Sequence, residues 1–294
     1  MKSSLLTACA VLVVPVVSSF AQAPAAIPAD DVAKIEAIVG DALQTKPAKA
    51  RKVLVFSKCE GFVHGDGIAY GNRALAIAAA KTKAFEADLT TDYAAVNDKA
   101  TLSKYDAVVL LNTTLLKTKD NPAFAPNLIE FVKGGHGLCV IHAGADNFYD
   151  APEAAEMVGG QFDGHPWTAD GTWAFKLDDP ASPLNQAFGG KNFKTGDEIY
   201  QQKSPFYDRS KLHVLVSLDL TDEKTANANI DKQKRTDKDF AVSWIRHYGE
   251  GRVFYTSFAH DKRAFLDKAR LTHILAGLQY AIGDLKADDK PVAK

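Results

Sequence analysis

One stretch of this chain reads Gly137-Leu138-Cys139-Val140-Ile141-His142-Ala143, an apolar run that ends at a histidine. An uninterrupted apolar run of this length is typical of a strand that is buried on both faces of a sheet. Two other runs have the same form, because Val53 to Phe56 leads to His64 and Val253 to Thr256 leads to His260. In an open α/β sheet, ligands bind at the carboxyl ends of the strands. The sequence therefore predicts that three histidines from remote segments meet at one edge of a sheet.

Strand and helix patterns alternate through the first half of the chain. Strands are predicted at 52–56, 85–90, 106–111 and 137–141, and helices at 67–83 and 122–133. This alternation favours an α/β fold with a doubly wound, mostly parallel sheet flanked by helices, of the flavodoxin-like type.

The pattern becomes irregular after Ala151. The sequence predicts a helix at 151–158, shorter strands at 172–177, 198–201 and 213–217, and a closing helix at 265–282. Residues 241–245 and 252–258 flank a glycine-containing turn at 248–251, which predicts an added β-hairpin. The polar segment 219–239 is predicted to be an exposed loop.

Four segments are predicted along the chain. Residues 1–23 read as a signal peptide, with a positive start at Lys2, an apolar stretch too short to span a bilayer, and the cleavage site Ala21-Gln22-Ala23. Residues 24–50 are a linker and a short helix capped by Asp30 and Asp31, residues 51–283 form one α/β domain, and 284–294 are a charged tail. We therefore expect an exported, periplasmic protein without a membrane span, cleaved near Ala23.

The charge balance excludes some classes of partner. The chain has 35 Lys and Arg against 36 Asp and Glu, and loss of Lys2 with the signal leaves 34 against 36, a formal charge of −2. Such a surface gives no electrostatic reason to expect a nucleic acid or an anionic membrane as partner. A homo-oligomer remains compatible with it. Cys59 and Cys139 would remain in the exported chain, and the sequence leaves open whether they form a disulfide.

The loop that contains His64 is rich in glycine and suggests an alternative. Gly65, Gly67 and Gly71 have the spacing G-x-G-x-x-x-G, one residue longer than the dinucleotide-binding fingerprint, and Asp88 or Asp92 would then bind the ribose. The competing interpretation is a turn loosened by glycine, and no nucleotide is expected.

A nucleophilic mechanism has little support. Cys139 falls inside a predicted buried strand, where a thiol is normally inert, and no G-x-S-x-G motif is present for a serine nucleophile.

Histidines and one carboxylate are the best candidates for chemistry. Neutral imidazoles transfer protons near neutral pH and bind divalent metals. We predict His142 as the central acid/base group, with His64 and His260 beside it, and Glu198 as a carboxylate that faces the site. The same three histidines are the candidate ligands of a divalent metal, zinc or similar, with one position left open.

Several polar and aromatic residues are candidate substrate contacts. His165 and Trp167 lie in an irregular loop that suits a sugar ring or, alternatively, packs on its own aromatic side chains. Asp146, Tyr200 and Asp261 are further candidates, and Asp261 is also expected to orient His260. The other histidines are interpreted as structural, at turn, strand-edge and helix-surface positions: His136, His213, His247 and His273.

These segments together resemble the trehalose-utilisation (ThuA-like) family, whose fold is like that of the class I glutamine amidotransferases. The resemblance runs from about Lys52 to Ile282 and rests on the following stretches: 61–64, 137–143, 160–166, 197–200, Trp244 with 248–255, and His260-Asp261. The family usually has arginine before the first histidine, where this chain has Val63, and the cysteine nucleophile of the amidotransferases is absent from the turn after the strand.

The resemblance implies a role in carbohydrate catabolism, with trehalose-related glycosides or their keto forms as substrates. The first hypothesis is therefore a hydrolase, lyase or isomerase that uses histidine acid/base chemistry, with or without a metal. The second is a sugar-binding or accessory protein that uses the same site without turnover. A nicotinamide-dependent dehydrogenase is the third.

Overall fold

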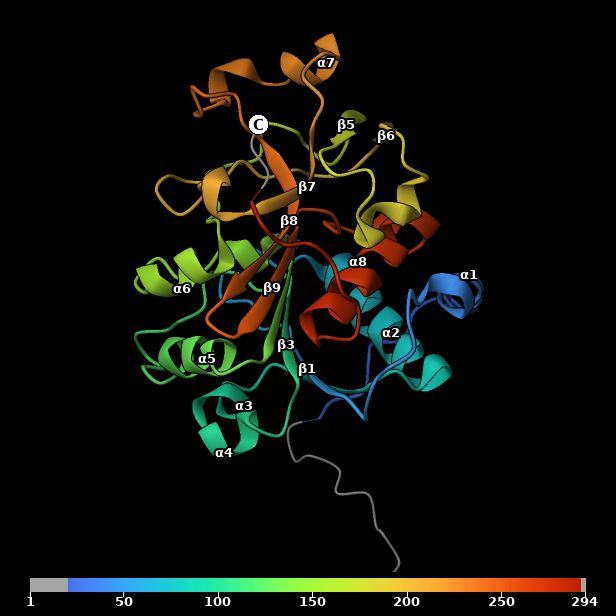
Figure 1. The fold of residues 1–294 in the computed structure, drawn as a ribbon, viewed down its shortest axis with the longest axis vertical. Coiled ribbons are helices and arrows are strands. Elements are labelled where there is room, and N and C mark those ends of the chain that lie inside the picture. The colour runs from blue at the N-terminus through green and yellow to red at the C-terminus, as the bar shows by residue number, and fades with distance from the viewer. Residues whose placement is uncertain (1–20, 292–294) are drawn as a thin grey trace, which may run out of the picture.

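The computed structural model describes residues 21–291, so most of the predicted signal peptide, residues 1–20, lies outside the described chain. The described residues form one nine-stranded sheet with the order β2-β1-β3-β4-β9-β8-β7-β5-β6. Figure 1 shows this sheet nearly edge-on, with helices on both sides. The predicted α/β class, with a mostly parallel core sheet flanked by helices, is confirmed.

One half of the sheet is parallel. Its strands, in spatial order, are β2 (Glu86–Thr90), β1 (Lys52–Phe56), β3 (Ala107–Leu111), β4 (Gly137–Ile141) and β9 (Gly251–Thr256). Every residue of β3 and β4 is buried, as the uninterrupted apolar runs predicted. All five strands run in the same direction, so their carboxyl ends lie along one edge.

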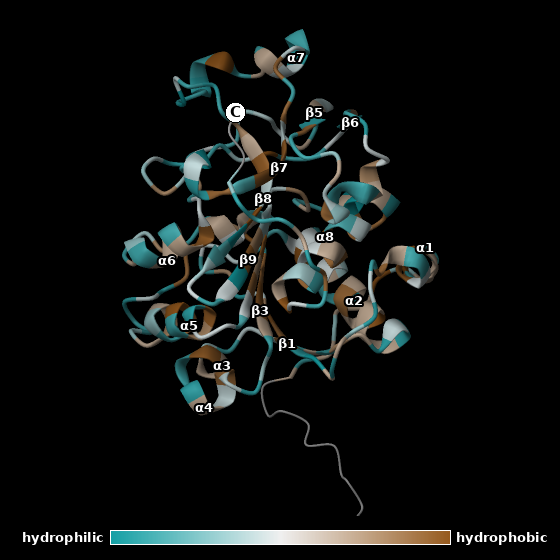
Figure 2. Ribbon diagram, in the orientation of Figure 1, coloured by the Kyte–Doolittle hydropathy of each residue, from teal (hydrophilic) through white to brown (hydrophobic). Residues whose placement is uncertain are grey.

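Helices cover both faces of this half. One face is covered by α1 (Ala29–Ala42), α2 (Gly65–Thr82) and α8 (Lys268–Ala281), and the other by α3 (Ala94–Asn97), α4 (Lys99–Leu102), α5 (Phe124–Lys133) and α6 (Pro152–Val158). Successive residues of a strand point to opposite faces, so Val53 and Val55 join one core and Leu54 and Phe56 the other. Figure 2 shows the apolar strands β1 and β3 between the two helical layers.

The other half is antiparallel. β8 (Ala241–Tyr248) returns along β9 through the predicted turn, which confirms the added hairpin. The sheet continues through β7 (His213–Leu218), β5 (Trp173–Leu177) and the short β6 (Phe193–Thr195). The connections contain five short 3-10 helices: His142–Ala145, Pro183–Phe188, Arg209–Lys211, Ile230–Lys232 and Lys262–Ala264.

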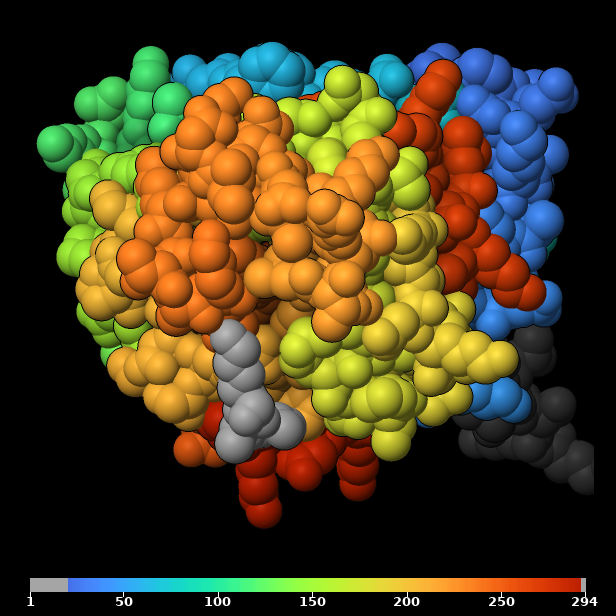
Figure 3. Space-filling model, turned by 90° about the horizontal axis from the view of Figure 1, so that it is seen from above, coloured from blue at the N-terminus to red at the C-terminus, as the bar shows by residue number. Residues whose placement is uncertain are grey.

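Three local predictions were wrong. Residues 198–201 form no strand, because this segment makes only isolated bridges, such as that between Trp167 and Ile199. The segment 219–239 is not a simple exposed loop: it contains α7 (Glu223–Ala226), and Thr225 in it is buried. Figure 3 shows this segment in orange, spread over one end of the molecule. Asp30 and Asp31 lie inside the first turn of α1, which begins after Pro28, instead of capping it.

The chain after α8 packs onto the domain. Nε of Arg51 donates to Oδ1 of Asp284 at 3.1 Å, and Leu285 is buried. Among residues 21–291, Cys59 and Cys139 are both free thiols, with Cys139 buried inside β4. No helix within residues 21–291 is long and apolar enough to cross a membrane.

Candidate active site

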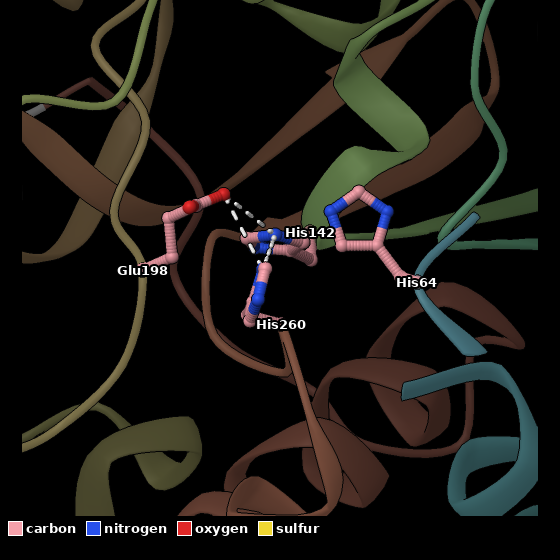
Figure 4. A group of neighbouring side chains, drawn as sticks. All are labelled: His64, His142, Glu198 and His260. Carbon is pink, nitrogen blue, oxygen red and sulfur yellow. Dashed lines mark hydrogen bonds and ion pairs between the residues drawn. The ribbon is translucent and has the colours of Figure 1, made fainter. Parts of the chain in front are cut away.

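Four side chains from separate segments converge beyond the carboxyl ends of the parallel strands. His64 follows β1, His142 follows β4, His260 follows β9, and Glu198 comes from the irregular segment before β7. One potential ligand atom of each residue lies within 4.8 Å of the others. Figure 4 shows that all four side chains point toward one another. We call this group the histidine centre.

His142 is held in a tight turn directly after β4. Its backbone has φ +48°, a left-handed conformation that residues other than glycine rarely adopt. The turn is so close to β3 that a Cβ on Gly144 would lie 2.7 Å from the carbonyl oxygen of Leu110. This turn places the imidazole, which is fully buried, at the middle of the centre. Strained backbone of this kind is concentrated at functional sites.

The proton on His142 is fixed by a backbone carbonyl. Nδ1 lies 2.6 Å from the carbonyl oxygen of Ser257, which can only accept a hydrogen bond. In the neutral ring Nδ1 therefore carries the proton, and Nε2 directs its lone pair into the centre. A carbonyl behind a histidine is the usual arrangement for a metal-ligating imidazole.

His260 lies between His142 and the carboxylate. Its Nδ1 is 3.3 Å from Nε2 of His142 and 3.3 Å from Oε1 of Glu198. Burial acts to lower the pKa of His260, but the hydrogen bond and charge of Glu198 outweigh burial and raise it. The backbone N–H groups of Ala259 and His260 donate to the buried carboxylate of Asp197 at 3.0 and 3.2 Å. That carboxylate therefore positions the loop that bears His260.

His64 has a nitrogen with no partner. Its ring centroid lies 4.9 Å from that of His142 and 5.0 Å from that of His260, edge to face. Nδ1 is buried and has no hydrogen-bond partner among the described residues. Burial is the main cause that lowers the pKa of His64 to about 3, and the neighbouring imidazoles lower it further. The ring is therefore neutral at physiological pH.

Glu198 closes the fourth side of the centre. Burial acts to raise the pKa of its carboxyl group, but the neighbouring imidazoles of His142 and His260 hold the pKa well below its usual range. Its second oxygen, Oε2, lies 3.3 Å from Nδ1 of His165, whose side chain is 47% exposed. The centre is thus buried on the sheet side and reaches solvent beside His165.

This donor set fits a divalent metal ion. It provides three imidazoles and one carboxylate, of which one imidazole has its tautomer fixed and another has an unpartnered nitrogen. An unsatisfied buried polar atom costs free energy that bonding to a cation would recover. Imidazole nitrogens and a carboxylate oxygen are common ligands of zinc and related ions.

Two predicted substrate contacts lie beside His142. The ring centroid of Tyr200 is 4.5 Å from that of His142, and the backbone N–H of Tyr200 donates to the Ser257 hydroxyl. Asp146 directly follows the 3-10 helix that begins at His142; burial raises its pKa, and its carboxylate accepts a hydrogen bond from the Tyr149 hydroxyl. The structure therefore brings Asp146, Tyr200 and His165 to the centre.

Two other placements differ from the sequence-based prediction. Trp167 is fully buried against Phe240, and its Nε1 donates to the carbonyl oxygen of Thr225 at 2.8 Å, so no surface is left for a substrate. The alternative of a loop packed by its own aromatic side chain is correct at this position. Asp261 does not orient the His260 ring, because its carboxylate accepts hydrogen bonds from the side chain and backbone of Arg263. Glu198 contacts that ring instead.

The alternatives based on a thiol or a nucleotide gain nothing from the structure. Burial raises the pKa of the Cys139 thiol far above its ordinary value, which makes it inert. Asp88 is paired with Lys52 at 2.9 Å and accepts from Tyr105, while Asp92 caps the backbone at Ala94. Both carboxylates that would bind a ribose are therefore used elsewhere.

Three supporting residues were missed by the sequence analysis. Asn112 follows β3 at the same edge, and its Nδ2 donates to the carbonyl oxygen of Ala259 at 3.0 Å. A polar residue directly after the apolar run 106–111 was a signal that could have identified it. Asp197 and Arg270 form a buried ion pair at 3.2 Å beneath the His260 loop, and no local pattern marks that pair.

Comparison with known proteins agrees with this architecture. The family described as trehalose utilisation (ThuA) matches residues 52–281, and the chain belongs to that family. A ThuA-like protein from Bacteroides uniformis has 20% identity and a TM-score of 0.66, with 81% of this chain and 95% of that chain covered. A ThuA-like protein from Parabacteroides merdae has 16% identity and a TM-score of 0.51, with 80% and 91% covered.

A more distant likeness is to a β-galactosidase from Bacillus circulans, with 16% identity and a TM-score of 0.49 over 82% of this chain and 32% of that chain. A comparison with curated proteins gives no match. The two ThuA-like structures establish the fold, and the family is described by its link to trehalose utilisation.

Proposed function

We propose that this protein is an enzyme of carbohydrate catabolism that acts on a glycoside or a keto-sugar by proton transfer at the histidine centre. The observation that carries the proposal is the convergence of four potential ligand atoms within 4.8 Å from four remote segments. The family's description, trehalose utilisation, supports a trehalose-related glycoside or its keto form as substrate. Hydrolase, lyase and isomerase chemistry all need a proton to move next to a sugar oxygen or an adjacent carbon.

The residues divide the work between binding and proton transfer. His64, His142, His260 and Glu198 would hold a divalent ion such as zinc, which would supply Lewis-acid polarisation of a sugar oxygen or water. His165 is the exposed partner of Glu198, so its imidazole can move a proton between a substrate bound at the centre and solvent. Asp146 and Tyr200 lie at the side of His142, where they can bind sugar hydroxyl groups.

We also propose export to a periplasm, with cleavage near Ala23. The support is the charged start, the short apolar stretch and the small-residue cleavage site in residues 1–23. Intact-mass measurement of the secreted protein would test it, because a mature chain that begins at Pro24 is expected.

Metal analysis of the purified protein is the first test of the enzyme. We expect about one divalent ion per chain, lost on chelation and restored by zinc or another first-row metal. Turnover should then be screened on glycosides and their 3-keto derivatives, before and after chelation. His247→Ala is a suitable control, because His247 is half-exposed and pairs with Asp289 away from the centre.

His142→Ala separates an enzyme from a sugar-binding protein. An enzyme should lose turnover by roughly 10²–10⁴-fold or more, whether His142 transfers a proton itself or holds the ion that polarises the substrate, and should lose much less sugar affinity. If sugar binds but neither the natural chain nor His247→Ala turns over any substrate, the protein is a binder. If no metal and no sugar bind, the proposal is wrong.

A further inference from the structure

Exposed apolar side chains are concentrated next to the histidine centre. Within residues 21–291, the exposed large hydrophobic residues are Phe62, Val63, Leu115, Tyr149 and Ile230. The first four lie on the loops that follow β1, β3 and β4, the strands that border the centre. We call these four residues the apolar rim.

The three loops are tied together by hydrogen bonds. The backbone N–H of Glu60 donates to the carbonyl oxygen of Thr114 at 2.9 Å, and the Thr114 hydroxyl donates to the carbonyl oxygen of Phe62 at 2.8 Å. The backbone N–H of Leu115 donates to the carbonyl oxygen of Asp146 at 2.8 Å. Asp146 in turn accepts from the Tyr149 hydroxyl. The rim is therefore a preorganised surface and not a set of independent loops.

Leu115 is exposed at a cost to the folded state. Its backbone has φ +47°, which is strained for a residue with a side chain, and 47% of its surface is exposed. Its side chain lies over Gly61, where a Cβ would be 2.8 Å from Cδ1 of Leu115. Packing does not account for a strained and exposed leucine, whereas a ligand that covers it would.

The rim is continuous with the centre. The ring of Phe62, 68% exposed, meets the ring of His64 edge to face with centroids 4.8 Å apart. Of the acidic side chains on these loops, Asp146 accepts a hydrogen bond from the Tyr149 hydroxyl, and Glu60 is paired with Lys58 at 3.5 Å and Lys117 at 3.7 Å. The leaving group of a glycoside bound at the centre would therefore contact aromatic and aliphatic side chains.

We infer that the apolar rim binds the aglycone of the substrate, so that glycosides of aromatic alcohols are preferred over disaccharides. This inference rests on the proposed function and names the substrate class within it. A second sugar ring would need hydrogen-bond partners for several hydroxyl groups, which the exposed atoms of Phe62, Val63 and Leu115 do not offer. A flat aromatic group gains from burial against these side chains and from stacking on Phe62 or Tyr149.

The experiment compares sugars that differ only in the aglycone. Phenyl glucoside, methyl glucoside and trehalose, with their 3-keto derivatives, are titrated into the metal-loaded protein by calorimetry and then assayed for turnover. We expect the phenyl compounds to bind about 10-fold or more tightly than the methyl compounds, which is the order expected for burial of one aromatic ring.

Three variants locate the effect. Phe62→Ala and Leu115→Gly should remove most of the preference for the phenyl compound over the methyl compound. Leu115→Gly should also raise the melting temperature, since it relieves the left-handed strain. Ile230→Ala is the matched control, because Ile230 is equally exposed but lies on the segment between β7 and β8.

The outcomes separate this inference from the proposed function. Equal binding of phenyl and methyl glucosides, with turnover of either, overturns only the inference about the aglycone. Concentration-dependent self-association that Phe62→Ala abolishes, with no aryl preference, assigns the rim to contact between copies and also overturns it. If no sugar binds to the metal-loaded protein, the proposed function is itself wrong.

Discussion

Two of the buried histidine environments in residues 21–291 differ most clearly in what surrounds the ring nitrogens. At the histidine centre, Nδ1 of His64 has no partner in the part of the chain that the structure describes, and Nε2 of His142 faces Nδ1 of His260 at 3.3 Å. In α8, His273 is equally buried, but its Nδ1 lies 2.8 Å from the carbonyl oxygen of Leu184 and its Nε2 lies 2.9 Å from the Ser243 hydroxyl. The first environment is incomplete without a further atom, and the second is complete.

This difference separates function from structure better than residue type or burial does. His273 was predicted to lie on a helix surface, and it lies in the core between α8, β8 and the Pro183–Phe188 turn. Burial lowers the pKa of both His64 and His273, to about 3 and about 4. The decisive observation is therefore the hydrogen-bond partner of each nitrogen.

The same substitution at both positions should give opposite results. His64→Leu should weaken metal binding by at least about 100-fold. Loss of a residue that only orients a metal ligand already costs up to about 100-fold, and His64 is itself a candidate ligand. It should leave the stability of the metal-free protein nearly unchanged, because an unsatisfied polar atom is removed. His273→Leu should keep the metal and lose about 2–4 kcal/mol, because the Leu184 carbonyl and the Ser243 hydroxyl lose a partner. Metal titration measures the affinity of both variants, and urea unfolding measures their stability. A large stability loss in His64→Leu would contradict the expected difference.

The two adjacent carboxylates, Asp197 and Glu198, extend the comparison. Asp197→Asn should destabilise the protein by about 3 kcal/mol or more, because buried Arg270 loses its counter-charge. Glu198→Gln should cost less stability and instead weaken metal binding. Chemical denaturation of both metal-free variants, with metal titration alongside, provides the test. Equal stability losses would show that Glu198 is as structural as its neighbour.

Acid should act on the His273 environment in a defined direction. In the unfolded chain His273 binds a proton near pH 6.5, whereas in the folded chain it stays neutral down to its pKa of about 4. The stability it contributes is thus complete above pH 6.5 and is lost as the pH falls toward 4, by about 3 kcal/mol in total. His273→Leu should remove this part of the pH dependence. Urea unfolding of both metal-free proteins between pH 7.5 and 4.5 should show a steeper decline for the natural chain, and parallel curves would contradict the assignment.

A pair of glycines in α2 gives the smallest expected effect. A Cβ on Gly67 would lie 2.7 Å from the carbonyl oxygen of His260 and 2.9 Å from that of Ala259, which are backbone atoms that cannot easily move. Gly67→Ala should therefore cost about 1–3 kcal/mol and weaken metal binding through a shift of His260. Gly65→Ala, two residues earlier, has nothing within 4 Å of the added carbon and should be neutral or slightly stabilising. Thermal unfolding and metal titration compare the two, and identical behaviour would exclude this packing argument.

The candidate site was only partly predictable from the sequence. His64, His142 and His260 were identified because each follows an apolar strand, and parallel strands share a carboxyl edge. Glu198 was predicted to face the site from a strand at 198–201, and it lies at the centre although no strand is present there. Trp167 was misplaced because its partner, Thr225, lies 58 residues away on another irregular segment. Asp261 was misplaced because its carboxylate pairs locally with Arg263.

The sequence by itself determined the α/β class, the parallel half of the sheet and the edge at which the histidines lie. These follow from local apolar patterns, which act over a few residues and need no long-range information. Only the tertiary structure decided which nitrogen atoms have partners, that Asp197 supports the His260 loop, and that Phe62 and Leu115 stand exposed beside the centre. Those properties depend on distances between segments more than 50 residues apart, and no periodic pattern within one segment records them.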